Sequence, residues 1–130
     1  MLEGKLKTED KIFQAALNVF FLYGYYGTTL HRIAIDAGVQ KSAVHYYFRT
    51  KDKLYTKVVV HVIENILKTN LTKNFKHRSL EEERWFFAIE MHNNQTFFLK
   101  ILHKYYPNDW EEKLKKMKLI LKIEMEVVKS

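Results

Sequence analysis

The stretch 40–54, QKSAVHYYFRTKDKL, directly follows DAGV at 36–39 and combines features that neither a protein core nor an ordinary surface loop requires. It opens with short polar and small side chains, continues with three aromatic rings at 46–48, and then carries the cations Arg49, Lys51 and Lys53. We expect the rings on one side to fix a helix to its own core. The cations and hydroxyls on the other side then face a negatively charged partner.

The composition of the 130-residue chain is typical of a helical protein with a polyanionic partner. Net charge is +7, and five cations but one anion fall between residues 39 and 57. Four glycines and one proline leave long runs free to be helical. The absence of cysteine excludes disulfides and thiolate metal sites. Because the N-terminus lacks the apolar core of a signal peptide and no run is long enough to span a membrane, we expect a cytoplasmic protein.

Helix start and stop signals define a short-helix unit in the first third of the chain. A helix over 8–23 is predicted, with Thr8 as N-cap and Gly24 after its end. Thr28 or Thr29 caps a second helix over 30–37, which Gly38 terminates. A third helix over about 41–47 follows. A short helix, a glycine turn and another short helix predict a helix-turn-helix.

The rest of the chain is also predicted to be helical. Valine-rich residues 58–63 have strand propensity, but the row Leu54, Val58, Val62 and Ile66 repeats every four residues, so a helix from 51 to about 74 is predicted. Further helices are expected over 80–92, over 95–106 before Pro107, and along the apolar stripe from Trp110 to Val128. The predicted fold class is all-α: a three-helix head with the helix-turn-helix (5–54), a long connecting fourth helix, and a short C-terminal helical body (55–130).

Small and hydrogen-bonding side chains at the start of the third helix suit the major groove of B-DNA, which admits little more than the helix itself. Gln40 and Lys41 are candidates to read base edges, and Ala43 is a candidate to contact a thymine methyl group. Ser42 belongs to the same small, polar helix start. His45, one turn later, shares part of this face and is a candidate for a base or phosphate contact.

A second group of side chains suits the phosphates that flank the groove. Tyr46 and Tyr47 offer phenolic hydroxyls, while Phe48 is expected to anchor the helix in the core. Lys51 adds its charge to the free N–H groups at the start of the fourth helix. The Thr28 and Thr29 pair, at the start of the second helix, offers another such site across the groove.

The ordered set of residues in this region resembles the DNA-binding domain of the TetR family of transcriptional regulators over 12 to about 67. The matching positions are Ala16, Phe20, Gly24, Gly27-Thr28-Thr29, Ile33-Ala34, Ala37-Gly38-Val39, Lys41, Tyr46, Phe48, Lys51 and Leu54. The resemblance implies that the third helix reads an operator, that Tyr46 and Lys51 hold phosphates, and that the protein acts as a homodimer. Ser42-Ala43 and His45 depart from the family's frequent residues at base-reading positions, so the operator cannot be borrowed from a relative.

The C-terminal body leaves two interpretations open. The aromatic residues Trp85, Phe86, Phe97 and Phe98 either line a pocket for a small-molecule effector or belong to the core or the dimer surface. Family members usually carry a longer ligand-binding body, and barely sixty residues follow the fourth helix here. The stripe from Trp110 to Val128 is expected to be intrachain core, subunit seam or both.

The sequence therefore predicts a sequence-specific, homodimeric regulator of transcription, most simply a repressor, that binds a palindromic operator in double-stranded DNA. The alternative is a helical interaction module whose basic head binds an acidic protein. No cofactor or membrane partner is expected. No metal site is expected either, because no two histidines have ligand spacing. No enzyme is expected either, since there is no phosphate-binding glycine loop or nucleophile motif.

Overall fold

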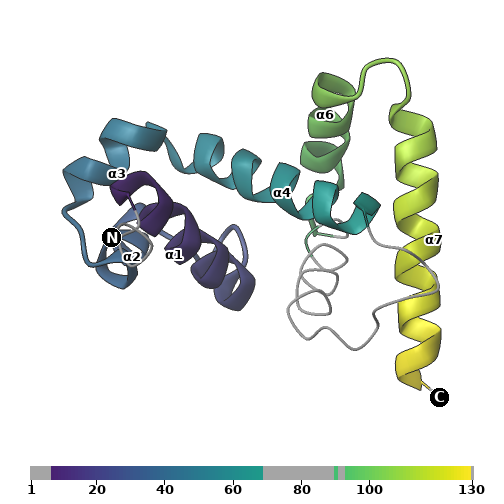
Figure 1. Ribbon diagram of the computed structural model, residues 1–130, viewed down its shortest axis with the longest axis horizontal. Coiled ribbons are helices and arrows are strands. Elements are labelled where there is room, and N and C mark those ends of the chain that lie inside the picture. Colours follow the sequence, from purple (N-terminus) through teal and green to yellow (C-terminus); the bar gives the residue numbers. More distant parts are fainter. Residues whose placement is uncertain (1–6, 69–89, 91–92, 130) are drawn as a thin grey trace, which may run out of the picture. The chain divides into compact units, whose positions relative to one another are not determined.

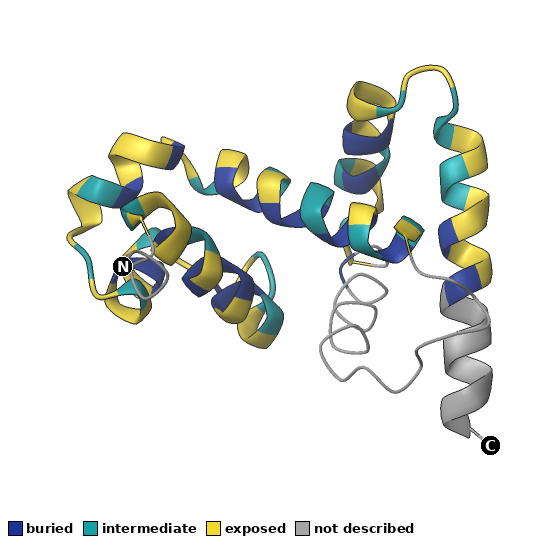
Figure 2. Cartoon of the chain, viewed as in Figure 1, coloured by how far each residue is buried: buried dark blue, intermediate teal, exposed yellow. Residues whose placement is uncertain are grey.

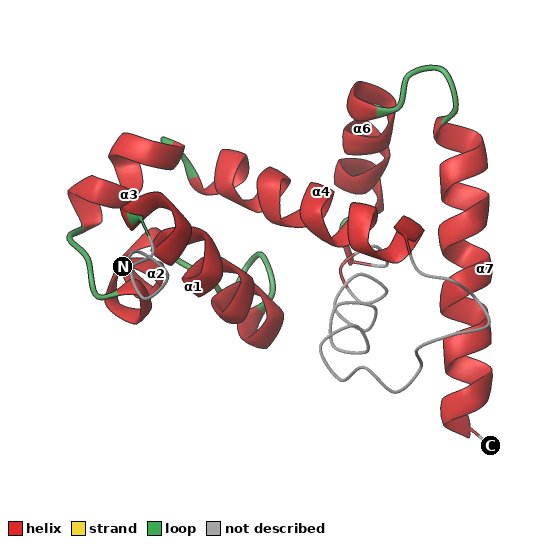
Figure 3. Ribbon diagram, viewed as in Figure 1, coloured by secondary structure: helices red, strands yellow, loops and turns green. Residues whose placement is uncertain are grey.

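The computed structural model describes residues 7–68, 90 and 93–129, and in this part of the chain all regular structure is helical (Figures 1 and 3). The helices are α1 (Thr8–Tyr23), α2 (Leu30–Ala37), α3 (Lys41–Phe48), α4 (Lys51–Lys68), α6 (Gln95–Tyr105) and α7 (Trp110–Lys129). The predicted all-α class is confirmed. Apart from residue 90, which is helical, the predicted helix over 80–92 lies outside the described residues, as does the predicted continuation of α4 beyond Lys68.

The chain divides into two compact units, Met1–Val58 and Val59–Ser130, and α4 passes from the first into the second. In the first unit α1 packs against α2 and α3, and α2 also packs against α3. The largest fully buried side chains of this unit are Ile12, Phe20, Ile33, Leu54 and Tyr55. Figure 2 shows buried residues recurring along one side of α1, as expected for a helix with one apolar face.

The ends of α1 and α2 follow from backbone geometry. Thr8 is already helical and Lys7 occupies the N-cap position without a side-chain hydrogen bond, so the prediction of Thr8 as N-cap was wrong by one residue. Gly24 ends α1 with φ 71° and ψ −178°, a conformation open almost only to glycine. The Thr29 hydroxyl accepts from the Arg32 N–H at 3.1 Å, which makes Thr29 the cap of α2.

A strained turn at a single residue joins α3 to α4. Arg49 has φ 72° and ψ −64°, and the Thr50 N–H donates to the Phe48 carbonyl at 2.8 Å. These values describe a γ-turn with positive φ, a rare conformation for a residue with a side chain. The Thr50 hydroxyl then accepts from the Lys53 N–H at 3.1 Å, so α4 begins with a side-chain cap where the sequence predicted its start.

The valine-rich segment of α4 is helical, as its four-residue repeat predicted. Val58, Val59, Val62, Ile63 and Ile66 are all fully buried. Tertiary burial of these rows outweighs the intrinsic strand preference of β-branched residues, which is a fraction of a kilocalorie per mole each.

The second unit contains the end of α4 and the pair α6 and α7. Phe98, Ile101 and Leu102 of α6 are buried, as are Met117 and Ile120 of α7. Lys116 Nζ donates to the Leu67 carbonyl at 3.0 Å, which ties α7 to the end of α4. Of the predicted apolar stripe, Met117 is buried and Leu114 half-buried; the side chains at 121, 125 and 128 lie outside the described part.

The pKa of the Tyr106 phenol lies above its usual value. The larger cause is burial of the phenol, and the carboxylates of Glu64 and Asp109 nearby add to it. Asp109 directly precedes α7, and its carboxylate lies 3.3 Å from Lys113 Nζ. This ion pair joins the residue before α7 to the first turn of the same helix.

Gly27 precedes α2 and Gly38 follows it, and alanine substitutions at these two positions test the backbone geometry at the ends of this helix. A Cβ added at Gly27 would overlap the Tyr23 carbonyl oxygen, whereas at Gly38, with φ 70°, it would meet no atom within 4 Å. We expect Gly38→Ala to cost about 1 kcal/mol of stability through its positive φ alone. Gly27→Ala is expected to cost about 2–3 kcal/mol, because backbone must shift to relieve the overlap. Denaturant unfolding measures both, and equal losses would contradict the close approach at Gly27.

Candidate nucleic-acid interface

The outward surface of α3 consists of the polar residues that begin the helix and those one turn later. Gln40 is the N-cap residue, and its exposed side chain makes no capping hydrogen bond. Lys41, Ser42 and His45 are exposed and share a face, since they are three and four residues apart. The start of α3 is therefore open to a partner.

The opposite side of α3 attaches the helix to the first unit. Val44 and Phe48 are buried, and Ala43 between the two sides is half-buried. Phe48 thus occupies the core position that the sequence predicted for it. Of the three consecutive rings, only this one is buried, so the other two contribute to the surface.

Tyr46 and Tyr47 form an exposed aromatic pair in the last turn of α3. Their side chains are 68% and 38% exposed, and their rings meet edge to face with centroids 5.0 Å apart. Mutual packing restricts both rings while solvent reaches them. The pair can present hydroxyl donors to an anionic partner beside the α3 surface.

Lys51 is the first residue of α4 and lies over the ring of Tyr25, with Nζ 4.1 Å from the ring centroid. This distance is within the range of a cation–π interaction. The Thr50 hydroxyl caps the Lys53 N–H, and the first N–H groups of an α-helix have no acceptor within their own helix. A charge held at a helix N-terminus is a favourable arrangement for binding phosphate.

Tyr25 connects the α1–α2 loop to the first turn of α4. Its hydroxyl donates to the Asp52 carboxylate, and its ring packs against Tyr55 with centroids 4.9 Å apart. The ring of Tyr55 in turn packs against that of Phe20 in α1, with the centroids 4.9 Å apart. The hydrogen bond to Asp52, followed by partial burial and the charges of Asp52 and Tyr26, raises the pKa of Tyr25 to about 12.

Sequence reasoning missed the role of Tyr25 in this cluster. The only signal was Asp52, the single anion in a cationic stretch, whose partner lies 27 residues earlier. Such a separation leaves no periodic pattern that a reader of the sequence could use.

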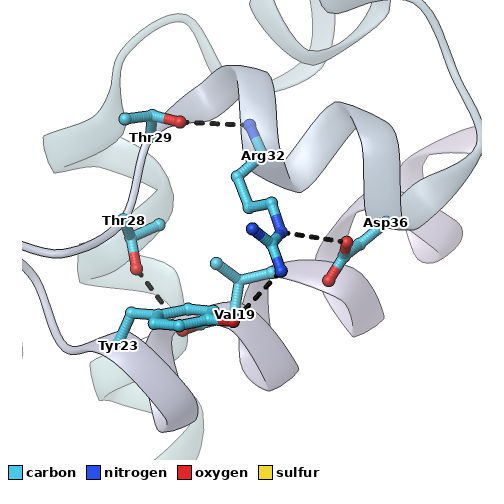
Figure 4. Close-up of polar contacts among 6 residues, drawn as sticks. All are labelled: Val19, Tyr23, Thr28, Thr29, Arg32 and Asp36. Carbon is cyan, nitrogen blue, oxygen red and sulfur yellow. Dashed lines mark hydrogen bonds and ion pairs between the residues drawn. The ribbon is translucent and has the colours of Figure 1, made fainter.

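The two threonines before α2 have different environments, as Figure 4 shows. Thr28 is 1% exposed, and its hydroxyl donates to the Gly24 carbonyl at 2.7 Å. The prediction that Thr28 contacts DNA therefore needs correction, because its hydroxyl is engaged inside the unit. Thr29 is exposed, and while its oxygen caps α2 its O–H remains a donor.

Arg32 on α2 is a further cation that the sequence reading did not single out. Its Nη2 donates to the Tyr23 hydroxyl at 3.0 Å, and its guanidinium lies 5.1 Å from that ring's centroid. Its Nε lies 3.4 Å from an Asp36 carboxylate oxygen (Figure 4). Because Asp36 balances its charge, Arg32 acts first as a link between α1 and α2.

The residues predicted for an effector pocket or dimer surface are only partly described. Trp85 and Phe86 lie outside the described residues, Phe97 is half-buried and Phe98 is buried. In the same unit, the ring centroids of His103 and Trp110 are 4.2 Å apart. Among the described residues no three metal-ligating side chains gather, and none of their helices is long and apolar enough to cross a membrane.

Residues 12–58 match the family model described as bacterial regulatory proteins, tetR family. The chain is 36% identical over 75 residues to the HTH-type transcriptional regulator RutR of Escherichia coli K12, covering 49% of this chain and 35% of RutR. It is 33% identical over 69 residues to the HTH-type negative transcriptional regulator IcaR of the biofilm operon icaADBC in Staphylococcus aureus strain Newman, covering 51% of this chain and 37% of IcaR.

A crystal structure of a HlyIIR mutant protein, in which one segment is replaced by a linker containing two thrombin sites, superposes with a TM-score of 0.59 at 25% identity, covering 87% of this chain and 70% of that one. These comparisons confirm the resemblance inferred from the ordered residues of the first unit. The chain spans little more than a third of the length of RutR and IcaR.

Removal of the Tyr25 hydroxyl tests the link to α4. We expect Tyr25→Phe to lower the free energy of unfolding by about 1 kcal/mol at neutral pH, because one hydrogen bond to a carboxylate is lost. Since the folded-state pKa is raised to about 12, the advantage of the wild type is complete below pH 10 and declines as the pH rises towards 12. Denaturant unfolding of both proteins between pH 7 and 12 measures this difference. A difference independent of pH would contradict the assigned hydrogen bond.

Proposed function

We propose that the protein is a sequence-specific DNA-binding regulator of transcription of the TetR family, acting as a repressor. The match of residues 12–58 to the model of bacterial regulatory proteins of the tetR family supports this proposal. The observation that carries the proposal is the open start of α3. Lys41, Ser42 and His45 share an exposed face on a helix whose other side is anchored by Val44 and Phe48. This division between anchored and open sides suits a recognition helix in a major groove.

In the proposed complex, α3 lies in the groove with its N-terminal residues against the base edges. Lys41 donates to acceptors of guanine, Gln40 pairs with adenine, and Ala43 approaches a thymine methyl group. Ser42, exposed beside Lys41, lies at the same groove-facing end of the helix. Half-burial of Ala43 limits it to an apolar contact at the margin of this surface.

Phosphate contacts in the proposed complex flank the recognition helix. Tyr46 and Tyr47 donate their hydroxyls, and Lys51 contributes its ammonium together with the N–H groups that begin α4. Thr29 contributes a hydroxyl at the start of α2. Contacts of this kind hold the helix in register, while the base contacts select the sequence.

We further propose that the protein binds as a homodimer to a palindromic operator in the cytoplasm and has no catalytic activity. Two copies of α3 would then enter successive major grooves about one helical turn apart. A small-molecule effector, if it binds the second unit, regulates DNA binding only by favouring one spacing of the two heads over another. IcaR, one of the similar proteins, is named as a negative regulator, which supports the choice of repressor.

Loss of the Lys51 charge is expected to weaken binding to operator and random DNA alike. We expect Lys51→Ala to reduce affinity about tenfold at moderate salt and to reduce the slope of log K against log salt by about 1, because one counterion fewer is released. Lys100→Ala, which removes an equal charge from an exposed position on α6, is the control. Fluorescence anisotropy across a salt series measures both variants. Equal effects of the two substitutions would reject the phosphate role of Lys51.

Selection from a random DNA pool distinguishes sequence-specific recognition from non-specific electrostatic binding of a basic protein to DNA. The wild type is expected to select a palindromic consensus, and Lys41→Ala to relax the preference at one base pair of each half-site by about 1–3 kcal/mol. Weak binding without a consensus would favour the alternative of a basic interaction module with an acidic protein partner. A consensus unaltered by Lys41→Ala would show that this residue does not read bases.

A further inference from the structure

The ring of His45 is tied to the strained turn that ends α3. Its Nδ1 lies 3.0 Å from the Arg49 carbonyl oxygen, and the Arg49 N–H donates to the His45 carbonyl at 3.0 Å. Two bonds therefore join the same two residues, one through the side chain and one through the backbone. The carbonyl belongs to the γ-turn at Arg49, so the ring covers an acceptor at the exposed end of the helix.

This contact determines which ring nitrogen carries the proton. A backbone carbonyl can only accept, so Nδ1 must be the donor. In a neutral imidazole the other nitrogen then carries no proton and acts as an acceptor. In its neutral form, the exposed ring of His45 therefore offers its surroundings an Nε2 lone pair.

An acceptor at this place excludes one class of DNA contact and selects another. Phosphate oxygens only accept hydrogen bonds, so a neutral His45 held in this way cannot bond to them. In the major groove the donors are the N6 amino group of adenine and the N4 amino group of cytosine. Guanine and thymine present acceptors at the corresponding edge, and these would repel the lone pair.

We infer that His45 is a specificity-determining residue whose Nε2 accepts a hydrogen bond from an amino base, adenine or cytosine, on the strand it faces. The inference rests on the proposed placement of α3 in the major groove. It also resolves the two contacts expected for this residue, a base or a phosphate, in favour of the base. Lys41, one turn earlier on the same face, is a pure donor and selects keto bases, so the two side chains read opposite patterns.

A purely structural role for His45 makes a different prediction. A histidine in the last turn of a helix can simply satisfy a terminal carbonyl, and its loss would then lower stability without changing sequence preference. The discriminating measurement is therefore base preference, read separately from the total affinity and from thermal stability.

Substitutions that keep or reverse the hydrogen-bonding character of His45 test the inference. The wild type and three variants are compared at pH 8 by selection from a random DNA pool. His45→Glu, an acceptor only, is expected to weaken overall binding but to keep the amino-base preference. His45→Arg, a donor only, is expected to change the preference from an amino base to a keto base. His45→Ala is expected to abolish the preference at this position.

A modified operator tests the same contact without changing the protein. At the base identified by His45→Ala, adenine is replaced by purine lacking the N6 group, or cytosine by its analogue lacking N4. We expect the wild type to bind the modified operator with about tenfold lower affinity than the unmodified one. The affinity of His45→Ala is expected to be the same for both operators.

The outcomes distinguish the inference from its premise. A palindromic consensus with a keto base at this position, or with no position that responds to His45, overturns the role of His45 and leaves DNA recognition intact. The same is true if the modified base weakens the wild type and His45→Ala equally. A pool that yields no consensus from the wild type overturns both.

Discussion

The packing of Tyr25 against the start of α4 is the contact on which the geometry of the first unit depends. Its ring lies under the Lys51 ammonium and against Tyr55, while its hydroxyl donates to Asp52. Together these contacts join a loop that follows α1 to the first turn of a helix that begins 26 residues later. The position of the Lys51 charge is thus set by the aromatic core as well as by its own helix.

The joint between α3 and α4 stores strain at the residue that separates them. Arg49 holds a positive φ in a γ-turn, a conformation that costs about 1–3 kcal/mol and persists only where surrounding contacts require it. Burial of Phe48 before the turn and of Leu54 after it supplies such contacts. The turn leaves only Arg49 and Thr50 between the end of α3 and the start of α4, and it directs the Arg49 carbonyl to the ring of His45.

The surface of α3 combines opposite hydrogen-bonding characters on a short helix. Lys41 can only donate, whereas His45, held by the Arg49 carbonyl, offers an acceptor. Alternation of donor and acceptor along one face is the property that a major groove can match in only a few sequences. In the proposed complex, the anchoring of α3 by Val44 and Phe48 therefore contributes to specificity, because it limits how far the two side chains can shift.

The sequence alone determined the helices of the described residues and most of the α3 surface. The four-residue repeat placed α4, Gly24 and Gly38 marked helix ends, and the polar start at 40–42 indicated an open face, since all three signals are local. Only the tertiary structure decided that Thr28 is buried, that Tyr25 holds Lys51, and that His45 bonds to a strained carbonyl. Burial and long-range pairing depend on how helices pack in three dimensions, and strain at a non-glycine residue is forced by that packing, so neither leaves a local pattern in the chain.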